Sequence, residues 1–242
     1  MDRLFKYLPS RYLDAFVGRG EVLFRSLSYY SNYEEMQARG DRNEGKRVFS
    51  PSGGLIVTNT TTGETSSRQG TFVSTAQDRD IFVFCMSKEL SPRLATKFTA
   101  DVCVEIIEPA LFLARIRTAL QLRKWVKQGR LLHGMVDYYS PKTEPLAEWA
   151  VPERMVMRKT TDYAYQAEYR LAFARGDALR VENVGVRIRP VEDVAAPTLE
   201  DHPKYTLKLG SLQKLVTGQQ THLPDPTAKG DGVHLNLSGH HF

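Results

Sequence analysis

The sequence predicts a domain of the α+β class, on the basis of three observations. Residues 165–174 alternate between apolar and polar side chains, as a half-buried strand does. Residues 81–86 are apolar on both faces, which is typical of a strand in the middle of a sheet. Residues 109–127 begin with an apolar stripe at helical spacing. The chain of 242 residues is long enough to bury a substantial core, and we expect one domain over residues 1–218.

The N-terminal part is expected to be a helix followed by a strand. Residues 3–19 are predicted to be helical, because apolar side chains recur near helical spacing at Leu4, Leu8, Tyr12 and Phe16. Residues 21–27 resemble a strand in which Arg25 shares a face with Leu23 and Leu27. An unpaired guanidinium is costly among apolar neighbours, so we expect Arg25 to have an anionic partner.

The middle of the chain contains signals for a hairpin, a short helix and a second core strand. We expect residues 55–58 to pair with residues 71–74 around a polar tip. Residues 91–100 fit a helix with a serine cap and a proline in its first turn. Residues 102–107 are a further apolar strand candidate beside residues 81–86.

The C-terminal third is expected to contain four strands and a tail. After residues 165–174, strands are predicted at residues 184–188, 205–209 and 214–217. Beyond Gly218 the composition turns to Thr, Pro, Gly, Asp and His, which predicts a loosely ordered tail over residues 219–242.

The strand at residues 165–174 carries one apolar and one chemically equipped face. Tyr169, Leu171 and Phe173 are expected to face a core. Gln166, Glu168 and Arg170 face the other way, and only Ala172 and Ala174 lie beyond them. This pattern suggests the floor of a cleft with room for a ligand. The alternative is an ordinary half-buried strand whose charges are solvated.

Composition and charge restrict the classes of function. Hydrophobic residues make up 41% and charged residues 25% of the chain, which argues against a disordered or fibrous protein. No apolar run reaches the length of a membrane span, and the N-terminus lacks a signal peptide, so we expect a cytoplasmic protein with no membrane partner. The thiols of Cys85 and Cys103 are expected to be buried and reduced.

A basic segment stands out against a formal net charge of +5. Residues 109–132 contain no acidic residue and carry six basic ones, namely Arg115, Arg117, Arg123, Lys124, Lys127 and Arg130. Such a cluster suits a polyanion, either a nucleic-acid backbone or a nucleotide pyrophosphate. A solvated helix face is the alternative.

Several well-known motifs are absent, and two groupings of residues are left. The sequence has no P-loop, no GxGxxG, no HExxH and no GxSxG, and no metal site is expected. The first grouping combines Arg25, Ser74-Thr75 and Gln166-x-Glu168, and the tyrosines at 29, 30 and 33 would complete it as stacking aromatics. A carboxylate, a phosphate-binding arginine and stacking aromatics suit the breaking of an N-glycosidic bond. The second is a metal-dependent nuclease pair at Glu168 and Arg170, completed by Asp137 or Asp162.

Several short motifs follow one another along nearly the whole chain. They are Lys6-Tyr7-Leu8, Phe24-Arg25-Ser26-Leu27-Ser28-Tyr29-Tyr30, Phe84-Cys85-Met86-Ser87, Cys103-Val104-Glu105-Ile106, Glu168-Tyr169-Arg170-Leu171 and Leu215-Val216-Thr217-Gly218. Their order resembles a broad bacterial family of domains of unknown function. The chain departs from that family at Ser31-Asn32-Tyr33, where the family has Asn-Asp-Pro.

The segment Gln166-Ala167-Glu168-Tyr169 also resembles the last strand of mono-ADP-ribosyltransferases, including the DarT-type toxins that modify nucleic acid. The resemblance makes Glu168 the catalytic glutamate and Gln166 the residue two before it. Arg25 would match the first-strand arginine of the Arg–Ser–Glu class. Ser74-Thr75 would match its Ser-Thr motif, although the third residue here is Ala76.

This second resemblance implies NAD as a substrate, a split mixed or antiparallel sheet with flanking helices, and a toxin or antiviral-defence setting with an antitoxin partner. We therefore expect an NAD-dependent mono-ADP-ribosyltransferase that modifies RNA or DNA. Its NAD contacts would be Arg25, Ser26, Tyr29, Tyr30, Tyr33, Ser74, Thr75 and Arg170. The basic segment would receive the nucleic acid. A metal-dependent nuclease and a non-enzymatic nucleic-acid-binding or interaction module are the alternatives.

Overall fold

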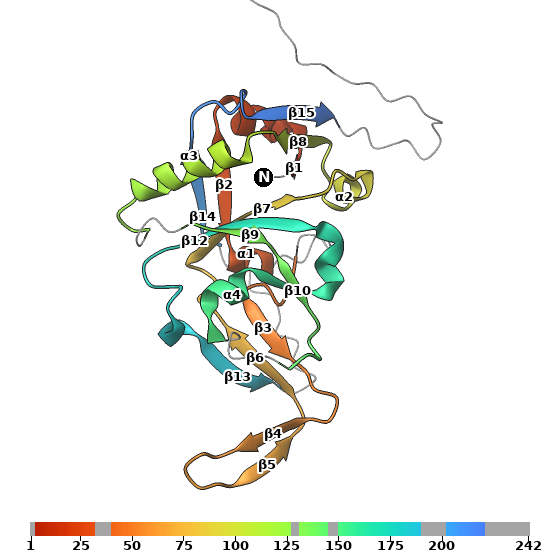
Figure 1. The fold of residues 1–242 in the computed structure, drawn as a ribbon, viewed down its shortest axis with the longest axis vertical. Coiled ribbons are helices and arrows are strands. Elements are labelled where there is room, and N and C mark those ends of the chain that lie inside the picture. Colours follow the sequence, from red (N-terminus) through yellow and green to blue (C-terminus); the bar gives the residue numbers. More distant parts are fainter. Residues whose placement is uncertain (1–2, 32–39, 127–130, 145–149, 190–201, 221–242) are drawn as a thin grey trace, which may run out of the picture.

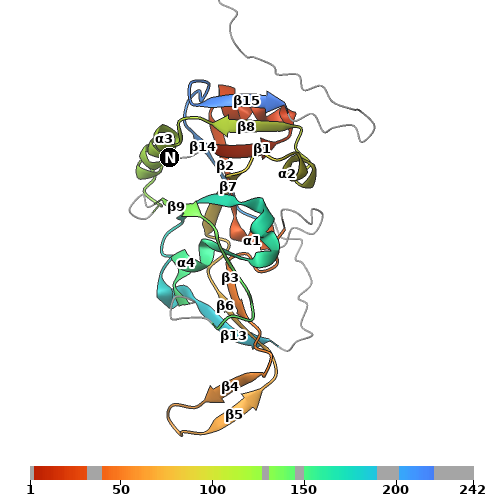
Figure 2. The ribbon, with the colours of Figure 1, turned by 45° about the vertical axis from the view of Figure 1, so that its right-hand side comes forward.

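The computed structural model describes residues 3–31, 40–126, 131–144, 150–189 and 202–220 (Figure 1). The fold is α+β, as the sequence predicts, and its sheets are mostly antiparallel. A large sheet with helices α2 (Pro92–Lys97) and α3 (Pro109–Gln121) forms one half of the molecule. Smaller sheets form the other half, and the hairpin of β4 (Leu55–Thr58) and β5 (Thr65–Arg68) projects at its far end (Figure 2). No helix in the described ranges is long and apolar enough to span a membrane.

The large sheet is organised around β7 (Ile81–Ser87), which is nearly all buried. One edge of β7 pairs along its whole length with β12, and the other edge is shared between β2 and β1. The sheet therefore divides at β7. Its other strands are β1 (Leu4–Leu8), β2 (Glu21–Ser26), β8 (Val102–Ile106), β9 (Leu132–Met135), β12 (Glu168–Ala174), β14 (Lys204–Lys208) and β15 (Val216–Gln220).

Smaller sheets and short helices complete the described part of the chain. Three strands form a second antiparallel sheet, β3 (Lys46–Phe49), β6 (Thr71–Thr75) and β13 (Gly185–Arg189). Two further pairs are antiparallel β4 (Leu55–Thr58) with β5 (Thr65–Arg68), and parallel β10 (Asp137–Tyr139) with β11 (Arg158–Thr160). The α-helices are α1 (Leu27–Ser31), α2 (Pro92–Lys97), α3 (Pro109–Gln121) and α4 (Pro152–Val156). Short helical turns cover Ser10–Tyr12, Asp14–Gly18, Thr161–Gln166 and Val181–Asn183.

The main core lies between the large sheet and α3. Phe82 of β7 stacks on Phe173 of β12 with ring centroids 5.4 Å apart, and Phe24 of β2 meets Phe173 at 4.9 Å. Phe112, Ile116 and Leu120 of α3 belong to the same buried cluster. Burial of this many large apolar side chains supplies the main favourable free energy of folding.

The sequence predicts most of the strands within one or two residues. Predicted strands are confirmed at residues 21–26, 55–58, 81–87, 102–106, 185–189 and 204–208. The helix after Ser91 is also confirmed, and the Ser91 hydroxyl accepts a hydrogen bond from the backbone N–H of Leu94. The strand expected at residues 214–217 begins later, at Val216, and runs to Gln220. Residues 221–242 of the expected tail lie outside the described residues.

The expected helix over residues 3–19 is wrong. Residues 4–8 form an inner strand of the sheet, with Leu4 on one side and Phe5 and Tyr7 on the other, all buried. A spacing of four residues is also a multiple of the two-residue repeat of a strand, so the apolar pattern fits both structures. Only short helical turns follow, at Ser10–Tyr12 and Asp14–Gly18.

The expected hairpin and the expected long basic helix also differ in the structure. Residues 55–58 pair with Thr65–Arg68, because the turn between them is tighter, while β6 pairs with β3 and β13. Helix α3 ends at Gln121, and the chain then turns so that Val126 is buried. Arg123 and Lys124 therefore do not continue a helix face.

Candidate functional site

The two faces of β12 are as different as the sequence predicts. Tyr169, Leu171 and Phe173 are buried in the main core. On the other face, Glu168 lies opposite Ser87 of β7 and Arg170 lies opposite Cys85. Glu168 and Arg170 thus share one face of the sheet.

The expectation of an open cleft floor on that face is wrong where the alanines lie. Every residue of β12 is buried. Ala172 and Ala174 pack in a cluster with Met155 and Val156 of α4. The small side chains make room for this helix, whose apolar residues the sequence does not assign to any partner.

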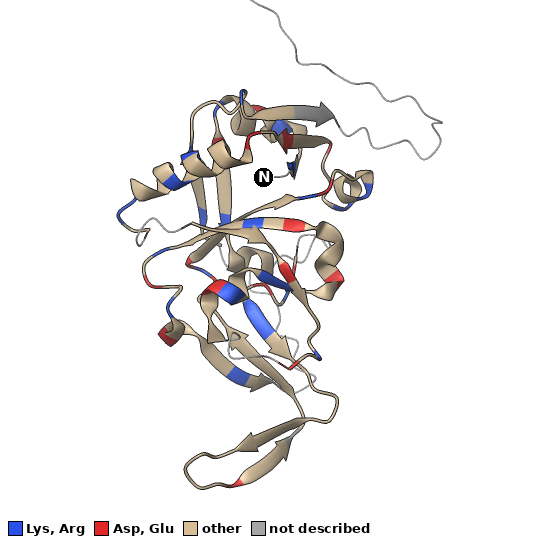
Figure 3. Ribbon diagram, viewed as in Figure 1, with Lys and Arg blue, Asp and Glu red and all other residues tan. Residues whose placement is uncertain are grey.

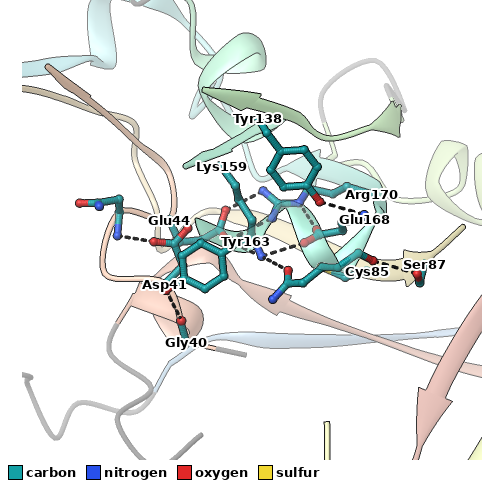
Figure 4. A network of polar contacts seen from close by, with 12 residues as sticks. Gly40, Asp41, Glu44, Cys85, Ser87, Tyr138, Lys159, Tyr163, Glu168 and Arg170 are labelled. Carbon is teal, nitrogen blue, oxygen red and sulfur yellow. Dashed lines mark hydrogen bonds and ion pairs between the residues drawn. The ribbon is translucent and has the colours of Figure 1, made fainter. Parts of the chain in front are cut away.

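Four charged side chains form a closed network beside α4 (Figure 4). The guanidinium of Arg170 donates from Nε to Glu168 Oε1 at 2.7 Å and from Nη1 to Glu44 Oε1 at 2.6 Å. It also donates to the backbone carbonyl of Val156. Lys159 Nζ lies 2.7 Å from Glu168 Oε2 and 3.5 Å from Glu44 Oε2. Two cations and two carboxylates therefore compensate each other.

This network, which comprises Glu44, Lys159, Glu168 and Arg170, is withdrawn from solvent. The side chain of Arg170 is 0% exposed and that of Glu168 is 4% exposed. Buried charges are tolerated when they are paired and hydrogen-bonded, and here each carboxylate oxygen has a cationic partner.

Gln166 joins the network from outside β12, which corrects its expected place on the strand. It ends the helical turn Thr161–Gln166, and Ala167 then takes a left-handed conformation with φ of 41°. The side-chain oxygen of Gln166 accepts a hydrogen bond from Lys159 Nζ at 3.0 Å. The hydroxyl of Tyr138 accepts one from the backbone N–H of Glu168 at 2.9 Å. Gln166 and Glu168 are thus neighbours through Lys159.

The network keeps the carboxyl group of Glu168 ionised. Burial raises the pKa of Glu168, but attraction to Arg170 and Lys159 outweighs burial and holds that pKa well below its ordinary value. For Lys159, burial lowers the pKa, while Glu168 and Glu44 raise it above its ordinary value. Glu168 is therefore a carboxylate at neutral pH. The stability that it contributes is present above the unfolded pKa and is lost as the pH falls through the folded one.

Asp41 lies next to the network and behaves in the opposite way. Its side chain is buried, and one carboxylate oxygen, Oδ2, has no hydrogen-bond partner among the described residues. Burial and the neighbouring charge of Glu44 raise its pKa to about 6. Asp41 therefore changes its charge in the mildly acidic range.

Arg25 lies on the same face of the large sheet as Glu168. Arg25 of β2 is opposite Val83 of β7, and Val83 is in turn opposite Ala172 of β12. Side chains directly opposite each other share a face, so Arg25 and Glu168 do as well. Their strands flank β7 on either side. Their partners on β7, Ser87 and Val83, are four residues apart, which is roughly 13 Å along the strand.

The guanidinium of Arg25 lies beside aromatic rings. Its guanidinium lies 4.0 Å from the ring centre of Tyr29, which is a cation–π contact. Tyr29 meets Tyr30 edge to face at 5.2 Å. Leu23, which was expected to help bury Arg25, is 40% exposed. The arginine and two of the three tyrosines are thus brought together, and Tyr33 lies outside the described residues.

The serine and threonine candidates are not gathered around Glu168. Ser26 follows Arg25 on β2, faces the other side of that strand and shares a hydrogen bond with Ser28. Ser74 of β6 is buried, and its hydroxyl points to the sulfur of Met155. Thr75 lies on the opposite face of β6. Ser26, Ser74 and Thr75 therefore lie outside the network.

The basic segment is divided among several partners. Arg115 donates to the backbone carbonyl of Ser211, and Arg123 donates to the hydroxyl of Tyr205. Lys124 is exposed, whereas Lys127 and Arg130 lie outside the described residues. Figure 3 shows lysines and arginines in both halves of the molecule.

The carboxylates suggested for a nuclease are not assembled with Glu168. Asp137 pairs with Arg158 at 2.9 Å, and Asp162 is exposed at the start of a helical turn. Within the ranges that the structure describes, no group of three or more His, Cys, Asp or Glu side chains is placed to hold a metal ion.

The sequence does not identify three members of this site: Glu44, Lys159 and Asp41. A buried arginine between apolar neighbours requires a carboxylate partner, so Arg170 signals that a partner exists. The signal does not say which of the distant acidic residues supplies it, since Glu44 lies 126 positions away.

Comparisons of the chain with protein-family models, with curated proteins and with solved structures found no match. The function must therefore be argued from the geometry of the site.

Proposed function

We propose that this chain is an NAD-dependent mono-ADP-ribosyltransferase that acts on nucleic acid. The observation that supports the proposal is the common face of Glu168 and Arg25, which lie on strands at either side of β7. An extended dinucleotide is long enough to contact both. Tyr29 and Tyr30 lie beside Arg25, where a ring of the ligand could stack.

Each side chain has a definite role in this proposal. Loss of nicotinamide leaves positive charge on the ribose, and the ionised carboxylate of Glu168 would stabilise that charge. Gln166 would orient the acceptor. Arg25 would hold the pyrophosphate, for which a guanidinium supplies several donors in a fixed geometry.

The proposal requires the network to open at Glu168. Both carboxylate oxygens of Glu168 are engaged in ion pairs, one with Lys159 and one with Arg170. A ribose hydroxyl can therefore bind Glu168 only if it displaces one of these two cations. Lys159 is the partner that can leave, because its ammonium group already lies 3.5 Å from Glu44. Arg170 is held from a second side by Glu44 and by Val156, and it would keep the carboxylate in place.

The acceptor would approach the exposed cations of the basic segment. Arg117 on α3 and Lys124 beyond its end are exposed, and the guanidinium of Arg117 lies 2.6 Å from His133 Nε2. Cationic side chains attract the phosphates of RNA or DNA, and this attraction weakens with salt.

Nicotinamide release and label transfer test the proposal. The chain is incubated with NAD that carries its label on the adenylate half and with RNA, DNA or protein acceptors. We expect Glu168→Gln to lower the rate by about 100-fold or more, as loss of a charge-stabilising group does. Glu182→Gln, at an exposed position, is the matched control and should leave the rate unchanged.

The folding of each variant is checked by near-ultraviolet circular dichroism. Arg25→Met provides a second variant outside the network. Equal transfer by wild type, Glu168→Gln and Arg25→Met, all folded, would reject the catalytic assignment.

A non-enzymatic nucleic-acid-binding module is the second candidate. It is favoured by the burial of Glu168, whose two carboxylate oxygens are already held in ion pairs. In that case the network serves only to hold the fold. Binding of RNA or DNA would then be salt-sensitive, would survive Glu168→Gln, and would be lost when Arg123, Lys124 and Lys127 are replaced together. Cleavage of the nucleic acid without NAD, abolished by a chelator, would instead indicate a nuclease.

A further inference from the structure

A second buried arginine, Arg47 on β3, is not compensated in the way that Arg170 is. Arg47 is 5% exposed, and its guanidinium lies 3.5 Å from the ring centre of Tyr139. Two of its nitrogens, Nε and Nη1, are buried, and neither has a hydrogen-bond acceptor among the described residues. Buried donors of a charged group are strongly unfavourable without an acceptor.

The ribbon of β10 and β11 separates Arg47 from the network. Tyr138 and Lys159 face the network and contact Glu168. Tyr139 points the other way and reaches β3, where its hydroxyl accepts a hydrogen bond from the backbone N–H of Val48 at 3.1 Å. The two buried arginines, 47 and 170, therefore lie on opposite faces of one two-stranded ribbon.

A second guanidinium adds positive charge to the Arg47 side of the ribbon. Arg158 of β11 faces the same way as Tyr139, because it is in register with Asp137, two residues before Tyr139 on β10. Burial lowers the pKa of Arg47, Tyr139 partly offsets this, and the charge of Arg158 lowers the pKa as well. Asp137 pairs with Arg158 at 2.9 Å and is largely exposed. The positive charge of Arg47 is thus left without a contacting carboxylate in the described part of the chain.

We propose that Arg47, stacked on Tyr139, binds a phosphate-type oxyanion, either free phosphate or the phosphoryl group of a larger ligand. Such an anion presents oxygens in several directions, which suits unmet donors on two different nitrogens. The positive charge of Arg158 adds to the attraction. β3 is one of the two edge strands of its sheet within the described residues. This site is separate from the one proposed for NAD.

Thermal unfolding and calorimetric titration in a buffer free of phosphate and sulfate test this assignment. Inorganic phosphate is the first probe, ADP-ribose is the second, and acetate is the carboxylate comparison. We expect phosphate to raise the unfolding midpoint of the wild type in a saturable way. Arg47→Met should weaken phosphate binding by about tenfold or more, because it removes charge-assisted hydrogen bonds.

Two further variants serve as controls. Arg187→Met, at an exposed position of the same sheet, should bind phosphate as the wild type does. Tyr139→Phe keeps the ring and should change the affinity by less than about twofold. Without added anion, Arg47→Met should unfold at the same temperature as the wild type or higher, since it removes an unpaired buried charge.

Each outcome decides the assignment. Tighter binding of ADP-ribose than of phosphate, lost in Arg47→Met, identifies a nucleotide phosphoryl group as the source. Phosphate binding that is at least as tight as ADP-ribose binding, and is lost in Arg47→Met, identifies free phosphate. The assignment is overturned if phosphate has no effect on the wild type, if Arg47→Met binds phosphate equally well, or if Arg47→Met is destabilised in anion-free buffer. None of these results depends on transferase activity.

Discussion

Arg170→Met is expected to lower the free energy of unfolding by about 3–5 kcal/mol, since one partner of a buried ion network is removed. Arg170 binds Glu168 and Glu44 at once. Without it, two buried carboxylates are left to Lys159 alone. Arg170→Lys keeps the charge but cannot reach both carboxylates in the same geometry, so we expect an intermediate loss.

Urea unfolding at neutral pH measures this effect. Arg187→Met is the control, since Arg187 is exposed on β13, and its change should stay within about 0.5 kcal/mol. A loss of less than about 1 kcal/mol for Arg170→Met would contradict a tightly coupled network.

Asp41→Asn is expected to stabilise the protein at neutral pH by up to about 3 kcal/mol. Burial and Glu44 raise the pKa of Asp41 from its ordinary 3.8 to about 6, and a difference of this size corresponds to about that free energy. A raised pKa means that the folded state holds the proton more tightly. The stabilising contribution of Asp41 is therefore fully present below pH 3.8 and is lost as the pH rises through about 6. Asparagine resembles the protonated acid at every pH.

The pH dependence separates this effect from a simple change in packing. Unfolding is measured between pH 3 and pH 8 for the wild type, for Asp41→Asn and for the exposed control Asp162→Asn. The gain for Asp41→Asn should be small at low pH and should grow through the range where Asp41 ionises. A destabilised Asp41→Asn at neutral pH, or a gain that does not vary with pH, would show that Asp41 is not a strained buried carboxylate.

The local sequence pattern is enough to predict a strand or helix where one physical signal dominates. Residues 81–86 are apolar on both faces and lie in the central strand β7, and residues 168–174 alternate as predicted. The helix of α2 begins where a serine cap and a proline coincide. Each of these signals depends only on neighbouring residues.

The site itself depends on partners that are distant in sequence. The alanines at 172 and 174 indicate space, but the sequence cannot show that α4 fills it. In the same way, Glu44 and Arg170 are individually ordinary charged residues, and only the fold places them in contact. The residues at 4–8 show the remaining difficulty, because one apolar spacing fits both a helix and a strand.

Calorimetric titration with NAD tests the central claim most directly. The account predicts saturable binding of one NAD per chain. It also predicts affinity weakened by about tenfold or more in Arg25→Met, because a charge-assisted contact to the pyrophosphate is lost. The exposed control Arg93→Met should bind as the wild type does. Absence of binding at millimolar NAD, or equal binding by the wild type and Arg25→Met, would contradict the account.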